Sequence, residues 1–186
     1  IVKYCGMAAN GIYSLGFQIS LVIMYLQDAF NNAFVPYLMS NLKRNSFEIK
    51  RKIVRYTYLY FIGILVITVL FYYAVSIFFP YFVGDKYNDS LPFVIWISLG
   101  FAFNGMYKMV VNYIFFEEKT KYLAYITFTT AILNIVLDYL LISNPSIGMK
   151  GAAYANCLSW FVCFVLTWIV SNKVYKMPWF SAFKRI

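Results

Sequence analysis

Five long apolar runs dominate this chain and limit what it can fold into. A helix needs about 20 mostly apolar residues to cross the hydrocarbon core of a bilayer, and each run reaches or nearly reaches that length. The charged residues inside the runs are Asp28, Lys108 and Asp138. Soluble surface helices carry one polar face, and these runs have almost none. The pattern predicts an all-α, polytopic transmembrane helix bundle with spans at about 13–38, 56–79, 92–116, 122–142 and 152–170.

Positive charge is distributed unevenly between the two sides of these spans. The net charge is +9, but the connections on one side (41–55, 117–121 and the tail from Ser171) carry 12 Lys and Arg residues, against 3 on the other side. Basic residues concentrate in cytoplasmic loops, so we expect the chain to begin outside and to end in the cytoplasm. Topology and contact with anionic membrane lipids then explain the charge, and we expect no nucleic-acid partner.

The beginning of the chain favours a piece of a longer protein. Ile1 stands shortly before the first span, and no signal-peptide pattern precedes it. An odd number of spans that starts outside is typical of the C-terminal part of a transporter, so we expect residues 1–186 to form one transmembrane domain of a larger protein. The chain has no histidine, and its three cysteines give no disulfide framework. Neither an enzyme nor a cofactor or metal site is expected.

Polar residues recur at helical spacing inside four of the spans. Helical periodicity places each set on one side of its helix. Unpaired polar groups in hydrocarbon cost several kcal/mol, so these sets must face protein or water. A hydrated cavity and purely structural hydrogen bonds between helices both explain them. The sets are Ser14, Gln18, Tyr25 and Asn32, with Asp28 slightly to one side; Asn104, Lys108 and Asn112; Thr127, Thr130, Asn134 and Asp138; and Asn156, Ser159, Cys163 and Thr167.

The ionisable residues inside the spans favour a functional interpretation. Charges within a membrane mark ligand or ion pathways by default, and Lys108 lies roughly 12 Å from the inner end of its span at 1.5 Å per residue. It suits an anion such as a phosphate or pyrophosphate; the alternative is a structural pair with Asp28 or Asp138. The candidate ion-coupling residues are Asp28 and Asp138. The candidate substrate-binding residues are Lys108, Asn104, Asn112, Gln18 and Asn32.

Several short motifs follow one another in a fixed order between about residues 6 and 173. They are GIYS at 11–14 leading to LQDAFNNAFVP at 26–36, VGDKY at 83–87, EKTK at 118–121, and NIVLDYLLI at 134–142 followed by GMKGAAYA at 148–155. Together they resemble the C-terminal half of Wzx-type oligosaccharide flippases, which belong to the multidrug/oligosaccharidyl-lipid/polysaccharide exporter superfamily. That family more often has asparagine at the position of Asp138.

The resemblance implies a transporter with two six-helix lobes around a central cavity, of which this chain would form the last five helices. It implies alternating-access transfer of undecaprenyl-pyrophosphate-linked oligosaccharides, for O-antigen, capsule or other cell-surface polysaccharide, across a bacterial or archaeal plasma membrane. Lys108 would contact the pyrophosphate, and a proton or sodium gradient would drive transport. The expected partners are this lipid-linked substrate, membrane lipids and the N-terminal lobe of the same transporter.

Two other functions remain open from the sequence. A cation-coupled multidrug exporter of the same superfamily would have the same architecture, although cationic drugs prefer acidic sites to one with a lysine. A membrane-embedded polysaccharide polymerase is an alternative from a different class. Such enzymes usually need large outer loops with arginine or histidine, whereas the outer connections here are short.

Overall fold

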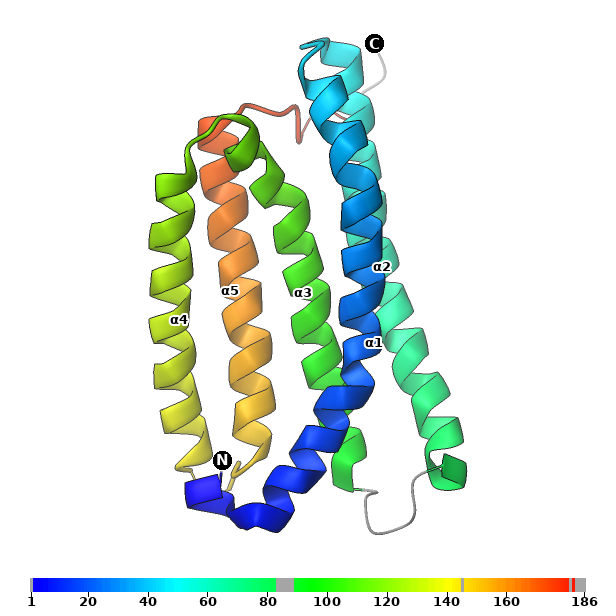
Figure 1. Cartoon of the computed structure of the whole chain (residues 1–186), viewed down its shortest axis with the longest axis vertical. Helices are drawn as coiled ribbons and strands as arrows, with labels where there is room; N and C mark the ends of the chain where they lie inside the picture. Colours follow the sequence, from blue (N-terminus) through cyan, green and yellow to red (C-terminus); the bar gives the residue numbers. More distant parts are fainter. Residues whose placement is uncertain (1, 83–88, 145, 181, 183–186) are drawn as a thin grey trace.

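Five α-helices form the computed structural model, which describes residues 2–82, 89–144, 146–180 and 182. The helices run alternately up and down, so that neighbours in sequence are antiparallel (Figure 1). No strand occurs in the described part of the chain, and the predicted all-α bundle is confirmed. The helices are α1 (Val2–Leu42), α2 (Phe47–Phe82), α3 (Leu91–Phe116), α4 (Thr120–Ile142) and α5 (Lys150–Val174).

Each of the five helices is long and apolar enough to span a membrane, and each contains one of the predicted spans. Large apolar side chains remain exposed on the outer helices: Leu59 and Ile62 of α2 are 68% and 63% exposed, and Phe128 and Ile135 of α4 are 69% and 67% exposed. Soluble monomers rarely expose so large a contiguous apolar surface. The chain is therefore a multi-pass membrane protein.

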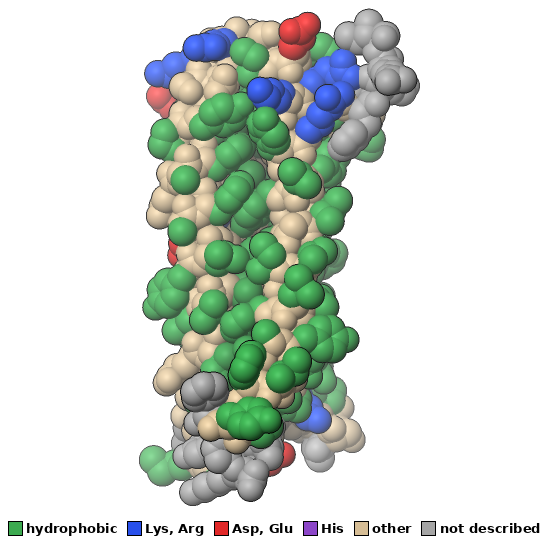
Figure 2. Space-filling model, turned by 90° about the vertical axis from the view of Figure 1, so that its right-hand side faces the viewer, with side chains coloured by type: hydrophobic (Ala, Val, Ile, Leu, Met, Phe, Trp, Pro, Cys, Tyr) green, Lys and Arg blue, Asp and Glu red, His purple; other side chains and the backbone are tan. Residues whose placement is uncertain are grey.

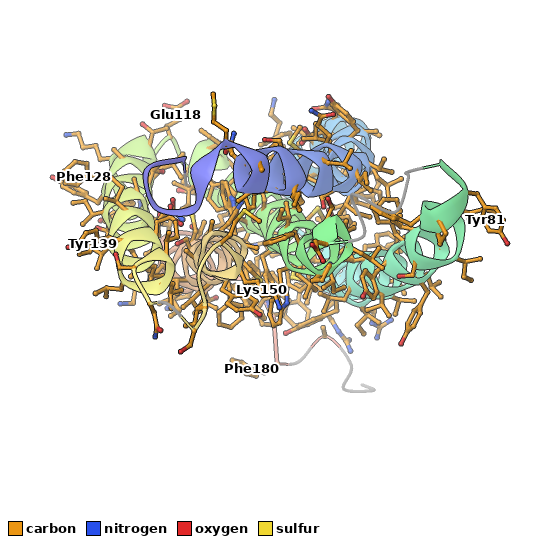
Figure 3. The ribbon with its side chains drawn as sticks, turned by 90° about the horizontal axis from the view of Figure 1, so that it is seen from below. Tyr81, Glu118, Phe128, Tyr139, Lys150 and Phe180 are labelled. Atoms are coloured by element: carbon orange, nitrogen blue, oxygen red, sulfur yellow. The ribbon has the colours of Figure 1, made fainter. Side chains whose placement is uncertain are left out.

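The central helix of the bundle is α3, which packs against each of the other four helices. It supplies more of the buried apolar side chains than any other helix, and Val94, Ile97, Val110 and Ile114 are fully buried. Seen along the helices, α4 and α2 lie at opposite ends of the bundle, with Phe128 and Tyr139 at one edge and Tyr81 at the other (Figure 3). A helix surrounded in this way can present side chains to two separate regions of the bundle.

Basic side chains gather at the end of the bundle where α1 ends and α2 begins. Figure 2 shows lysine and arginine side chains clustered at that end above a largely apolar surface. α2 begins at Phe47 rather than near residue 56, so most of the predicted loop 41–55 is helical, and its basic residues from Lys50 to Arg55 lie on the first turns of α2. At the opposite end lies Lys150, while the motif at 83–87 with Lys86 and the terminal Lys184 and Arg185 lie outside the described residues.

The tail after α5 folds back over the same basic end. The Trp179 ring packs 5.2 Å from the Trp168 ring and 5.8 Å from the Tyr58 ring, and Arg55 Nε donates a hydrogen bond to the Ala182 carbonyl at 2.8 Å. Phe180 lies on the opposite face of the bundle from α1 (Figure 3) and is 93% exposed. The tail therefore ties α5 to α2 at this end.

A change of direction near the start of α1 brings its first turns across the bundle (Figure 1). Non-helical backbone angles occur at Gly6, with φ of 83° and ψ of 173°. A residue with a Cβ rarely adopts a positive φ, so the glycine at this position permits the bend. Beyond it, α1 runs along α3 and brings Tyr13 close to the ends of α4 and α5.

Candidate functional site

A ladder of polar side-chain pairs joins α1 to α3 within the bundle. The two helices run in the same direction (Figure 1), so the paired residues follow the same order along both helices. On α3 the three residues are one turn apart, at the spacing predicted from the sequence. The α1/α3 polar ladder, as we call it, consists of the pairs Gln27 with Asn104, Asp28 with Lys108, and Asn31 with Asn112.

The two amide pairs of the ladder are well shielded. Gln27 Nε2 donates to Asn104 Oδ1 at 3.0 Å, and Asn112 Nδ2 donates to Asn31 Oδ1 at 3.3 Å. Asn104 and Asn112 are only 7% and 5% exposed. Gln27 is fully buried, and within the described chain its Oε1 atom has no hydrogen-bond partner. Each pair joins one amide N–H donor to one amide oxygen inside the bundle, which lowers the cost of placing these polar groups in a membrane.

The middle pair of the ladder is ionic. The Lys108 ammonium group donates to the Asp28 carboxylate, and the two side chains remain 27% and 36% exposed. Of the two acidic partners considered from the sequence, Asp28 is thus the one that Lys108 contacts. Pairing makes a charge inside a membrane far less costly. Partial exposure leaves the lysine within reach of an additional anion, because an ammonium group has three N–H donors.

Two predicted site residues of α1 lie away from the ladder. Gln18 and Asn32 are exposed on the surface of α1, as is Tyr25 at 62%. The face of α1 that meets α3 carries Ser20 instead, which is buried and donates to the Val94 carbonyl at 3.2 Å. The structure therefore brings Asn104, Lys108, Asn112 and Asp28 together, and it separates Gln18 and Asn32 from them.

A second polar region lies between α4 and α5 and contains Asp138. It is a groove of about 640 Å³ that the polar stripes of both helices line, as their spacing predicted. Tyr13 of α1 and Tyr107 of α3 also line it. The α4/α5 groove is lined by Tyr13, Tyr107, Thr127, Thr130, Ala131, Asn134, Asp138, Tyr139, Ile142, Ala152, Asn156, Ser159, Trp160 and Cys163.

Direct contacts across the α4/α5 groove join its walls. Asn134 Nδ2 of α4 donates to Ser159 Oγ of α5 at 3.2 Å, and the Tyr107 and Trp160 rings lie 6.0 Å apart. Tyr13 is close enough to Asn156 for a side-chain hydrogen bond. Sequence periodicity found Asn134 and Asp138 but gave no signal for the aromatic residues, because tyrosine and tryptophan are common everywhere in these spans.

Neither polar region has the composition of a metal site. Among the described residues, no group of three His, Cys, Asp or Glu side chains lies close enough to hold a metal ion. The chemistry available at the ladder and in the groove is hydrogen bonding, one paired cation and aromatic contact. Such groups can bind a ligand by hydrogen bonds, charge and ring contacts.

Comparison with known proteins supports the membrane assignment. The chain is 27% identical over 118 residues to an uncharacterized membrane protein of Haemophilus influenzae, and the match covers 63% of this chain and 29% of that protein. No protein-family model matches the chain, and no solved structure matches it. The chain thus spans less than a third of a longer bacterial protein to which it is similar, and that protein is described as a membrane protein.

Proposed function

We propose that this chain forms most of one lobe of a flippase that moves undecaprenyl-pyrophosphate-linked oligosaccharides across a bacterial or archaeal plasma membrane. Transport of such units serves the synthesis of cell-surface polysaccharides. The resemblance of the ordered motifs to Wzx-type flippases supports this proposal. A cavity between two lobes needs a second lobe. The membrane protein to which this chain is similar is long enough to contain one, since the match covers only 29% of it.

The observation that carries the proposal is the partly exposed cation in the α1/α3 polar ladder. Lys108 is held by Asp28 on one side and stays 27% exposed. A pyrophosphate has several oxygen acceptors and can add to this pair without displacing it, since lysine has spare donors. The buried amide pairs on either side fix the position of α3 against α1, and with it the position of the lysine.

The uneven distribution of basic residues supports an orientation with the tail in the cytoplasm. The described cluster at the α1–α2 end includes Lys43, Arg44 and Lys50, and Lys150 lies at the other end. Cytoplasmic loops carry the excess of basic residues. In this orientation the lysine-rich end would meet the anionic inner leaflet, where lipid-linked oligosaccharides are assembled.

The direct test is export of lipid-linked repeat units by the full-length protein. Deleting its gene in the organism of origin should remove a surface polysaccharide and cause lipid-linked units to accumulate inside. Lys108→Gln should lower export by about 10- to 100-fold, because a hydrogen bond to a charged group contributes about 1.5–3 kcal/mol. Lys108→Arg should retain part of the export activity.

A matched control is Lys150→Gln, which removes the same charge from an exposed position at the first residue of α5. It should export normally at wild-type abundance in the membrane. Normal surface polysaccharide after deletion of the gene would refute the flippase proposal. Normal export by Lys108→Gln, at wild-type abundance, would refute the role of Lys108 in it.

A further inference from the structure

The α4/α5 groove has the size and shape of a small-molecule site. Its volume of about 640 Å³ lies within the range of about 300–1,000 Å³ that is usual for ligand pockets. Thr127 and Ile142 mark its two ends on α4, which at 1.5 Å per residue makes it about 22 Å long. A groove of this length accommodates a short chain of linked rings rather than a single compact ion.

Aromatic rings form part of its walls. The Tyr107 and Trp160 rings are tilted at 53° to each other with centroids 6.0 Å apart, and Tyr13 lines the groove from α1. Their flat faces are apolar and electron-rich, while their polar atoms lie at the ring edges. A pyranose ring presents a face of polarised C–H groups to such a surface, and its hydroxyl groups project around the edge.

Hydrogen-bond donors and hydrogen-bond acceptors both lie beside these rings. Asn134, Asn156 and the groove hydroxyls can donate and accept, and Asp138 supplies an acceptor one turn from Asn134. An amide has two N–H donors and one oxygen acceptor, so the single bond from Asn134 to Ser159 leaves capacity for a ligand. Adjacent hydroxyl groups of a sugar match this mixture.

The charge of the groove disfavours an anionic ligand. Among the described residues that line it there is one carboxylate, Asp138, and no lysine or arginine. A phosphate would find no cationic partner in this lining. Aromatic faces, amides and one carboxylate acceptor are suited to a polyhydroxylated group that carries no negative charge.

The groove and the α1/α3 polar ladder lie on two sides of the same helix. Tyr107 lines the groove, whereas Lys108, the next residue of α3, belongs to the ladder. Successive residues point about 100° apart around a helix of 3.6 residues per turn. The two regions therefore lie on neighbouring faces of α3, and an amphipathic ligand that contacts both would place its anionic group at Lys108 and its neutral rings in the groove.

We propose that the α4/α5 groove binds the neutral sugar rings of the transported lipid-linked oligosaccharide. This inference rests on the proposed function, and it assigns a role to residues that the flippase proposal does not use. Trp160 and Tyr107 pack against the sugar rings, and Asn134, Asn156 and Asp138 bind their hydroxyl groups.

Binding of free sugars to the purified full-length protein tests the inference without transport. The probes are neutral mono- to trisaccharides of glucose, galactose and N-acetylglucosamine, observed by saturation-transfer NMR. Saturable binding is expected for at least one series, and Trp160→Leu and Asn134→Ala should each weaken it at least tenfold. The control is Trp96→Leu, which removes another partly exposed tryptophan of the bundle, outside the groove, and should bind sugars as the wild type does.

Accessibility of the groove provides a second measurement. With the native cysteines replaced by alanine, Asn134→Cys should react with a small water-soluble thiol reagent, and the bound sugar should slow the reaction. An unreactive Asn134→Cys would mean that another segment of the full-length protein fills the groove, and it would overturn the inference.

The outcomes separate this inference from the flippase proposal. No saturable binding of any probe, with export of lipid-linked units intact, would overturn the sugar groove and leave the flippase proposal standing. Binding that depends on Trp160, in a protein whose deletion leaves surface polysaccharide unchanged, would support the groove and refute the flippase. Binding that survives both groove substitutions would also overturn the inference.

Discussion

The packing of α4 against α5 predicts a sharp difference between two glycine substitutions. A Cβ at Gly151 would lie 2.6 Å from the backbone carbon of Leu141 and 2.8 Å from both its Cβ and its carbonyl oxygen. Ordinary contacts lie at 3.4–4 Å, and a backbone atom cannot rotate away as a side chain can. Gly151→Ala must therefore push the α4–α5 turn apart.

The expected cost follows from this displacement. Overpacking a tight contact costs about 1–3 kcal/mol, and Gly151 lies in the first turn of α5, where the gain in helix propensity is small. For a protein of this size 1 kcal/mol changes the unfolding midpoint by about 2–4 °C, so Gly151→Ala should lower it by roughly 2–12 °C. At Gly63, in the middle of α2, an added Cβ meets no atom within 4 Å, and alanine there should be neutral or stabilising by up to about 1 kcal/mol.

Thermal unfolding of the two purified variants in the same detergent measures the difference. Because α4 and α5 form two walls of the groove, Gly151→Ala should also weaken sugar binding, whereas Gly63→Ala should leave it unchanged. Equal unfolding midpoints for the two variants would show that α4 and α5 do not approach each other as closely as described, and the argument from the contact would fail.

Two further predictions concern the ladder and the orientation. Asn104→Leu leaves the buried amide of Gln27 without its acceptor and should destabilise the protein by about 1–3 kcal/mol. The double variant Asn104→Leu/Gln27→Leu should recover most of that loss, as measured by thermal unfolding. A double variant whose loss of stability equals the sum of the two single losses would contradict this prediction. In a background without native cysteines, Lys150→Cys should react with a membrane-impermeant thiol reagent in intact cells and Lys173→Cys only after permeabilisation; reaction of both from outside would refute the proposed topology.

The helices could be predicted well from the sequence alone, because a helix that crosses the hydrocarbon core needs about 20 mostly apolar residues. The predicted span 92–116 differs from α3 by one residue, since Ser90 and Pro92 mark its start and Glu117 marks its end. The predicted span 56–79 covers only the apolar part of α2, which extends back to Phe47. Charged residues there look like a loop to a hydropathy criterion, but a helix can leave the hydrocarbon core and continue among the headgroups.

The partners of the polar residues could be predicted only in part. The spacing of Asn104, Lys108 and Asn112 defined the face of α3, because one turn separates each from the next. On α1 two polar sets compete, and the sequence favoured the one with Gln18 and Asn32. Contact with α3 selects the other set, which contains Gln27 and Asn31. Which face of a helix meets a neighbour depends on packing between distant segments, and no local pattern encodes that choice.

The Lys108–Asp28 pair has two roles in this account: it joins α1 to α3, and it presents a cation to the anionic part of the substrate. A charge exchange separates the roles. Asp28→Lys alone places two cations together and Lys108→Glu alone places two carboxylates together, so each single variant should be destabilised. Their combination restores an ion pair between the same helices with the lysine moved to α1.

Export of lipid-linked repeat units by the double variant Asp28→Lys/Lys108→Glu, measured in the full-length protein and normalised to its abundance in the membrane, is therefore the most direct test. The account predicts that abundance and thermal stability return close to the wild-type level while export stays at least tenfold lower. Export at the wild-type level by this double variant would contradict it, because the pair would then only hold α1 against α3.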